Sequence, residues 1–144
     1  MKIAIGNDHR GFKLKLKIVD WLKNHGHQVE DAGAHSEESA DYPDYAGKVA
    51  KAVADGQSDW GILICGTGIG MSIAANKRKE IRAALCYKPE YASLTRMHND
   101  ANVLCLGEMN GDELNLEVLD VFMGTEFEGG RHQRRVDKIA GCCC

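Results

Sequence analysis

Cys65 and the glycine-rich loop that follows it are the residues of this sequence best suited to chemistry. The apolar run 62–64 ends at Cys65, and Gly66-Thr67-Gly68-Ile69-Gly70 then places glycine at every second position before a helical stretch at 71–77. A strand that passes through a glycine loop into a helix gathers backbone N–H groups and adds the positive end of the helix dipole. We therefore predict an oxyanion site beside Cys65, in surroundings where thiols ionise more readily.

The loop does not match the common nucleotide-binding patterns. The G-x-G-x-x-G fingerprint does not fit: aligned from Gly66 it has Met71 at the position of its last glycine, and aligned from Gly68 it has Ile73 there. No G-x-x-x-x-G-K-[ST] segment is present either. The alternative to an anion site is a tight strand-to-helix turn, with Cys65 as a small core residue.

Other polar residues could contact a ligand. Asp8 and His9 directly follow the first apolar run, although a lone histidine in such a place is more often a surface residue. His98 could act as a general acid near neutral pH, or could belong to a polar turn. Arg131 and Arg135 are four positions apart, so on a helix they share one face and could grip a phosphate. The alternative for them is a solvated basic helix start.

The composition is that of an ordinary globular protein. The chain has 144 residues, of which 44% are hydrophobic and 27% charged, and this fits one domain over residues 1–141. A net charge of −3 argues against a nucleic-acid partner. With no membrane-length apolar stretch and no signal peptide, we expect no membrane partner and a cytoplasmic protein.

The cysteines do not form a recognisable metal or disulfide pattern. None of the first three lies in a C-x-x-C pair, and each is in or beside an apolar run, so we predict no metal site. The final three, residues 142–144, are expected to be a disordered tail.

Apolar runs alternate with amphipathic stretches along the chain. Strands are predicted at 2–6, 28–31, 60–65, 82–86 and 102–106, and helices at 11–25, 41–56, 71–77, 88–97, 112–123 and 131–139. This alternation predicts an α/β three-layer sandwich, Rossmann-like or flavodoxin-like, with a five-stranded parallel sheet. Ligands bind beyond the carboxyl ends of such strands, which selects Asn7–His9 and Cys65–Gly70.

Taken together, these motifs resemble the ribose-5-phosphate isomerase B family, in the group that includes galactose-6-phosphate isomerase subunits. The matching segments follow the family order: Asp8-His9, Asp41-Tyr42-Pro43-Asp44, Ile64–Gly70, Ala74–Lys77, His98–Asn102, Leu106-Gly107, and Gly129–His132 with Arg135. One departure is Glu108-Met109, where many family members have arginine near the phosphate end, so sugar-length preference could differ.

The resemblance implies interconversion of D-ribose 5-phosphate and D-ribulose 5-phosphate, in the non-oxidative pentose phosphate pathway, without metal or organic cofactor. By this resemblance, Cys65 moves the proton between C1 and C2, and the enediolate oxygen is held by Thr67 and the amides of Gly66, Gly68, Ile69 and Gly70. His98, helped by Asp8, opens the furanose ring. The sugar hydroxyls are contacted by Asn99 and Tyr42, and the phosphate is held by His9, Arg131 and Arg135. The resemblance also implies a homodimer or homotetramer with sites completed across a subunit interface.

Two other functions fit the same residues. The first is the same chemistry on a hexose 6-phosphate of the allose or galactose type. The second is a non-catalytic phosphosugar-binding module, which would not need an ionisable residue at position 65.

Overall fold

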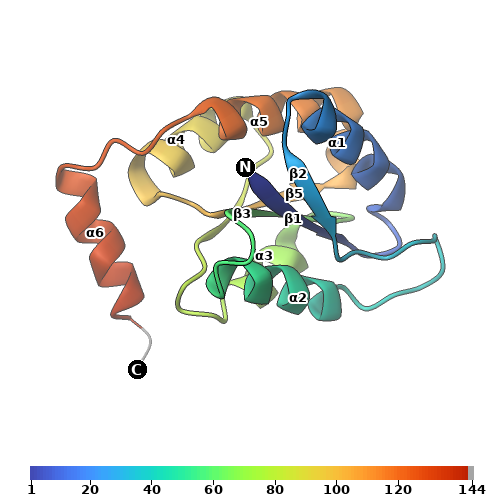
Figure 1. Cartoon of the computed structure of the whole chain (residues 1–144), viewed down its shortest axis with the longest axis horizontal. Helices are drawn as coiled ribbons and strands as arrows, with labels where there is room; N and C mark the ends of the chain where they lie inside the picture. The colour runs from blue at the N-terminus through green and yellow to red at the C-terminus, as the bar shows by residue number, and fades with distance from the viewer. Residues whose placement is uncertain (143–144) are drawn as a thin grey trace.

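The protein is built on a parallel sheet with helices on both faces (Figure 1). The computed structural model describes residues 1–142. The strands are β1 (Lys2–Asn7), β2 (Gln28–Asp31), β3 (Trp60–Cys65), β4 (Ala83–Leu85) and β5 (Val103–Gly107). The helices are α1 (Phe12–Asn24), α2 (Tyr42–Ala54), α3 (Ile69–Ala75), α4 (Pro89–Asn99), α5 (Asp112–Gly124) and α6 (Arg131–Ala140), with a 3₁₀ turn η1 (Glu108–Asn110). The predicted α/β sandwich with five parallel strands is confirmed.

The order of the strands is β2-β1-β3-β5-β4. From β1 the chain first adds β2 on one side of β1 and then adds β3 on the opposite side of β1. The winding direction therefore reverses between β1 and β3. Ligands bind outside the carboxyl ends of strands at such a point. The last two strands are interchanged relative to the flavodoxin order 2-1-3-4-5, because β5 inserts between β3 and β4.

Alternating side chains of each strand supply two separate cores. In β3, Ile62 and Ile64 face the layer of α1, α4 and α5, whereas Leu63 and Cys65 face the layer of α2 and α3. This alternation directs the Cys65 side chain toward the helix that its own loop begins.

The glycine loop is shorter than predicted. The prediction placed the start of the helix at Met71, but α3 begins at Ile69, so Ile69 and Gly70 already lie in its first turn. The reason is Gly68, which caps the helix with a φ of 79° and turns the chain directly into it.

A side chain occupies backbone groups at one margin of the sheet, and an ion pair lies near the other. On the β4 margin, the Asn76 side-chain amide pairs with the backbone of Ala83: Nδ2 donates to the carbonyl and Oδ1 accepts from the N–H, each at 2.8 Å. On the other margin, Glu30 of β2 forms an ion pair with Lys2 at 2.9 Å.

Helix α6 projects from the end of the molecule where α4 finishes (Figure 1). His132 and Val136 are its buried residues, and its other side chains are exposed. No helix within residues 1–142 has the length and apolar character needed to cross a bilayer. Of the predicted tail, Cys142 lies in the turn after α6, where its thiol donates to the Lys138 carbonyl at 3.2 Å; Cys143 and Cys144 lie outside the described residues.

Candidate active site

Cys65 ends β3 with its sulfur at the base of the glycine loop. The residue is 6% exposed, and the Gly68 N–H donates to Sγ over 3.1 Å. The Gly68 amide is therefore directed at the sulfur, while the Ile69 amide donates to Thr67 Oγ1 at 3.2 Å.

The other sheet cysteines are less suited to thiolate chemistry. Burial raises the pKa of Cys86 to about 12. The pKa of Cys105 is raised further, first by burial and then by the neighbouring Cys65 and Cys86. Both stay neutral thiols at neutral pH, which leaves Cys65 as the sheet cysteine placed at a ligand edge.

Close packing explains two glycines of the loop. A Cβ on Gly68 would lie 2.6 Å from Leu85 Cδ1, and its left-handed φ disfavours any side chain. A Cβ on Gly70 would lie 2.7 Å from two atoms of the Tyr42 ring. The structure thus brings Tyr42, at the start of α2, directly onto the loop.

Asp8 and His9 lie at the end of β1, next to the end of β3. The Asp8 N–H donates to the Ile64 carbonyl at 3.2 Å, and Oδ1 accepts from the N–H groups of Arg10 and Gly11 at 2.9 and 3.2 Å. Both side-chain bonds fall on Oδ1, so Oδ2 remains to meet a ligand. His9 Nδ1 lies 3.2 Å from the Ala40 backbone nitrogen and 3.3 Å from the Ala40 carbonyl oxygen, so the backbone of Ala40 holds the ring in place.

The segment after β5 completes this edge with residues that sequence reasoning did not assign to the site. The Met109 N–H donates to the Gly66 carbonyl at 3.0 Å, and Glu108 pairs with Arg10 at 3.4 Å. Glu108 directly follows β5, and Arg10 lies three residues after the end of β1; their placement after strand ends was the available signal. Met109 is 69% exposed.

The remaining predicted residues lie at the opposite edge of the sheet. His98 and Asn99 end α4, just before β5 begins at Val103, whereas Cys65 is paired with Gly107 at the far end of β5. The intervening strand spans about 13 Å. The predicted site is therefore divided into two groups. The carboxyl-edge group is Asp8, His9, Tyr42 and Cys65–Gly70; the amino-edge group is His98, Asn99, Arg131 and Arg135.

Comparison with known proteins identifies the family. The model of the Ribose/Galactose Isomerase family matches residues 3–139. The chain belongs to this family. It is 54% identical over 139 residues to ribose-5-phosphate isomerase B of Escherichia coli (strain K12), an alignment that covers 96% of this chain and 93% of that protein.

Solved structures in the ribose/galactose isomerase family have the same fold. Ribose-5-phosphate isomerase B of Clostridium thermocellum matches with a TM-score of 0.96 at 54% identity, covering 98% of this chain and 96% of that one. The ribose 5-phosphate isomerase of Thermotoga maritima matches with a TM-score of 0.94 at 53% identity, covering 97% of each chain.

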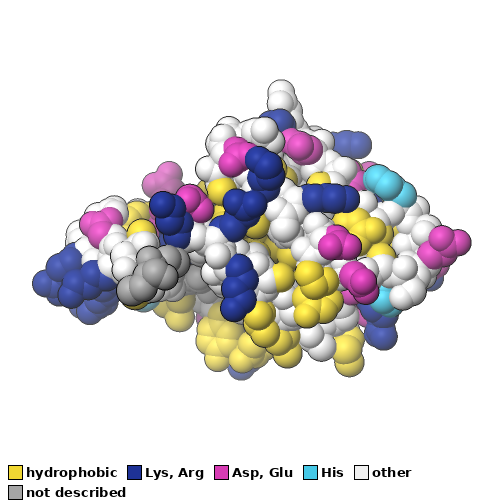
Figure 2. Space-filling model, turned by 90° about the horizontal axis from the view of Figure 1, so that it is seen from below, with side chains coloured by type: hydrophobic (Ala, Val, Ile, Leu, Met, Phe, Trp, Pro, Cys, Tyr) yellow, Lys and Arg dark blue, Asp and Glu magenta, His cyan; other side chains and the backbone are white. Residues whose placement is uncertain are grey.

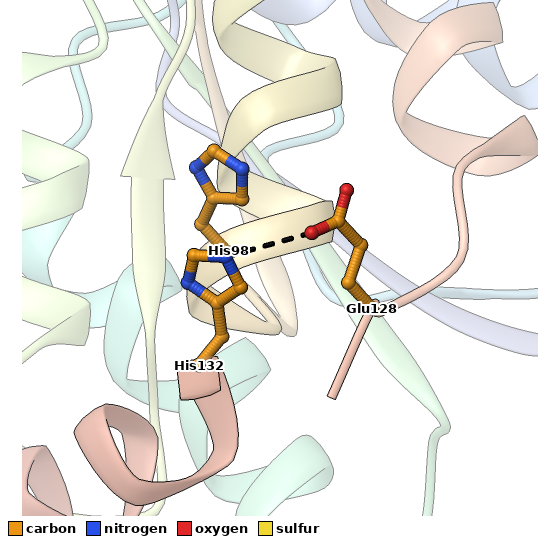
Figure 3. A group of neighbouring side chains, drawn as sticks. All are labelled: His98, Glu128 and His132. Atoms are coloured by element: carbon orange, nitrogen blue, oxygen red, sulfur yellow. Dashed lines mark ion pairs between the residues drawn. The ribbon is translucent and has the colours of Figure 1, made fainter. Parts of the chain in front are cut away.

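His98 of the amino-edge group forms a stacked pair with His132, and Glu128 lies beside it (Figure 3). The His98 and His132 rings stack with their centroids 4.2 Å apart and their planes 11° from parallel. His132 Nε2 lies 3.5 Å from Glu128 Oε2, and the Arg131 Nε–H also points at that nitrogen from 3.5 Å. Burial lowers the pKa of His132, as do His98, Arg131 and Arg135, while Glu128 acts in the opposite direction.

Within residues 1–142, His98, Glu128 and His132 are the group whose ligand atoms lie close enough to suggest a metal ion, all within 4.8 Å. The arrangement does not suit one. Imidazole lone pairs lie in the ring plane, so two nearly parallel stacked rings direct them side by side rather than at one point. The Arg131 guanidinium at the same nitrogen further disfavours a cation.

Asp100 fixes the end of α4 next to His98 and Asn99. It has a left-handed backbone with a φ of 46°. Its carboxylate accepts from Arg96 Nη1 at 2.8 Å and from Arg82 Nη2 at 3.0 Å. The two guanidinium groups hold the helix end in one orientation.

Proposed function

We propose that this protein is an aldose–ketose isomerase that interconverts D-ribose 5-phosphate and D-ribulose 5-phosphate. Support comes from the relatives that carry this name at 54% identity over nearly the whole chain. The structural observation that carries the proposal is the Cys65 sulfur, held by the Gly68 amide at the edge where ligands of this fold bind.

The chemistry needs a base and a place for negative charge. Cys65 as a thiolate removes the proton from C2 of the open-chain aldose, and the electrons move to O1 to form the enediolate. The Gly68 and Ile69 amides, predicted as donors to that oxygen, already donate to Cys65 Sγ and Thr67 Oγ1. The Gly66 and Gly70 amides are the loop donors left to stabilise it, an effect that contributes several kcal/mol in comparable sites. The proton then returns to C1 while the O2 proton is transferred to O1, with the Thr67 hydroxyl as a relay, and the ketose results.

Before this step the furanose ring must open. His98 donates a proton to the ring oxygen as its bond to C1 breaks, and Asp8, through its free Oδ2, accepts the proton of the C1 hydroxyl. His9, Arg131 and Arg135 hold the phosphate, which fixes the reacting carbons against Cys65.

These roles require more than one copy of the chain. Cys65 and His98 lie at opposite edges of the sheet, too far apart for a single pentose phosphate to touch both. In a homodimer, or a tetramer built from dimers, the carboxyl-edge group of one copy would meet the amino-edge group of another. The low exposure of Cys65 in a single chain is consistent with a site that needs a second copy for its walls.

Exposed apolar side chains provide surfaces for such an assembly. Hydrophobic side chains gather on the face seen in Figure 2, the side of α2 and α3, where Ile69 and Ile73 of α3 are 51% and 58% exposed. Tyr87, Tyr91 and Leu94 are exposed at and along α4. Contiguous exposed apolar surface of this kind marks interaction sites.

The test is turnover of ribose 5-phosphate by Cys65→Ala. We expect loss of turnover to background, with phosphosugar binding measured by calorimetry largely retained, because only the base is removed. Cys142→Ala is the matched control, since this exposed cysteine lies away from both groups, and it should keep the parent rate. Unchanged turnover in Cys65→Ala would remove the sulfur from its role.

The substrate is tested in parallel. A wild-type protein that binds ribose 5-phosphate without turnover would be a binding module. A large preference for allose 6-phosphate over ribose 5-phosphate would instead identify a hexose phosphate isomerase. The exposed Met109 is a reason to test this, because many family members have arginine in this loop near the phosphate end.

A further inference from the structure

His132 is a buried titratable side chain to which the proposed chemistry gives no role. Its side chain is 5% exposed although it lies in the first turn of the projecting α6. His132 is the buried polar side chain of α6, and its ring lies against the face of His98 (Figure 3).

Three contacts hold His132 against the end of α4. Its ring stacks on His98 at 4.2 Å. Its Nε2 has the Glu128 carboxylate on one side and the Arg131 Nε–H on the other, each at 3.5 Å. The Glu128 backbone N–H donates to the Met97 carbonyl at 3.1 Å, which joins the start of this arm to the residue just before His98.

The charges around the pair allow the stack to persist. Two imidazolium rings at this separation would repel each other. The groups that face His132 are His98 from α4, Glu128 from the preceding segment, and Arg131 and Arg135 from α6 itself. Of these only Glu128 favours a charged His132 ring, while burial, His98, Arg131 and Arg135 lower the pKa of His132 and so oppose a second positive charge against His98.

We propose that His132 is a positioning residue for His98. The flat face of its ring fixes the plane of the His98 imidazole, and thereby aims the nitrogen that gives its proton to the furanose oxygen. This inference rests on the proposed function, because it assigns His132 a part in the ring-opening step alone. It also places the ring-opening acid and the phosphate-binding arginines on one connected unit, α4 with α6.

The reaction offers a way to separate ring opening from proton transfer. Ribulose 5-phosphate cannot close a five-membered ring, because its O5 carries the phosphate. Incorporation of solvent deuterium at its C1 therefore reports the Cys65 step without ring opening. Turnover of ribose 5-phosphate, which is mostly furanose, requires both steps.

The test compares His132→Ala and His132→Phe in both assays. We expect His132→Ala to lower kcat for ribose 5-phosphate about 10- to 100-fold, part of what a general acid contributes, while C1 exchange in ribulose 5-phosphate stays within about twofold of wild type. His132→Phe keeps a flat ring against His98 and should recover most of the lost rate. Gln133→Ala, at the exposed neighbouring position, is the control and should leave both assays unchanged.

Several outcomes would overturn the inference. Equal losses in both assays would make His132 a residue of general assembly, and no loss in either would leave it without a role. A His132→Phe variant as slow as His132→Ala would exclude the stacking mechanism.

Failure of the underlying isomerase function would look different, since the wild type itself would then show neither turnover nor exchange.

Discussion

At the scale of single residues, one N–H group distinguishes Cys65 from the other cysteines of the sheet. Cys86 and Cys105 are enclosed by apolar side chains that raise their pKa values. Cys65 is almost as buried, but it ends its strand and receives the Gly68 amide. The backbone that follows Cys65 therefore sets this buried thiol apart, and the proposed chemistry would depend on the conformation of Gly68.

We predict that Gly68→Ala destabilises the fold and reduces turnover together. The φ of 79° is strained for alanine, and the new Cβ would meet Leu85 at 2.6 Å, so a loss of about 1–3 kcal/mol in the free energy of unfolding is expected. Urea denaturation followed by circular dichroism measures this loss.

Gly47→Ala is the matched control. This glycine lies within α2 with open space around its Cβ position, and alanine there should stabilise the protein by about 0.5–1 kcal/mol. A Gly68→Ala protein as stable and as active as the parent would contradict the importance of the left-handed turn.

At the scale of secondary-structure elements, the position of each functional residue follows from which end of an element carries it. The strand, loop and helix around Cys65 are contiguous, so their pattern was readable locally. His98 was also predicted as a candidate, but its separation from Cys65 depends on its place at the end of a helix that leads into β5. The contact of Arg10 with Glu108 depends on β5 lying beside β3, and strand order is a tertiary property that no local pattern encodes.

The end of α4 allows a prediction about Asp100. Asp100→Asn keeps a residue that tolerates the left-handed backbone but removes the carboxylate charge that pairs with both Arg82 and Arg96. We expect a loss of about 1–3 kcal/mol in the free energy of unfolding, and slower turnover of ribose 5-phosphate because His98 and Asn99 lose their anchor. Denaturation and steady-state kinetics measure the two effects.

Asp20→Asn provides the comparison for Asp100, since Asp20 lies on α1, away from both groups of site residues. Equal behaviour of the two variants would show that the Asp100 pairings do not hold the helix end.

At the scale of the whole molecule, the two groups of site residues face away from each other, and this makes a definite prediction for mixed oligomers. Cys65→Ala and His98→Ala should each be inactive alone. In a randomly mixed dimer population, half of the dimers contain one copy of each variant, and one of the two sites in such a dimer has both residues intact. Activity should therefore return to about one quarter of the wild-type value.

The mixing experiment needs conditions in which subunits exchange, verified by mass spectrometry of the intact oligomers. A site built within one chain would give no recovery at any mixing ratio, although heterodimers form.

The side-chain amide of Asn76 limits how copies of this chain can pair through their sheets. By occupying the backbone groups of Ala83, it acts as a one-residue substitute for a sixth strand and removes the template on which a neighbouring sheet could grow. Growth by β-addition, the route to fibres, is blocked there. Contacts between copies of this protein along that margin are therefore left to helices and loops.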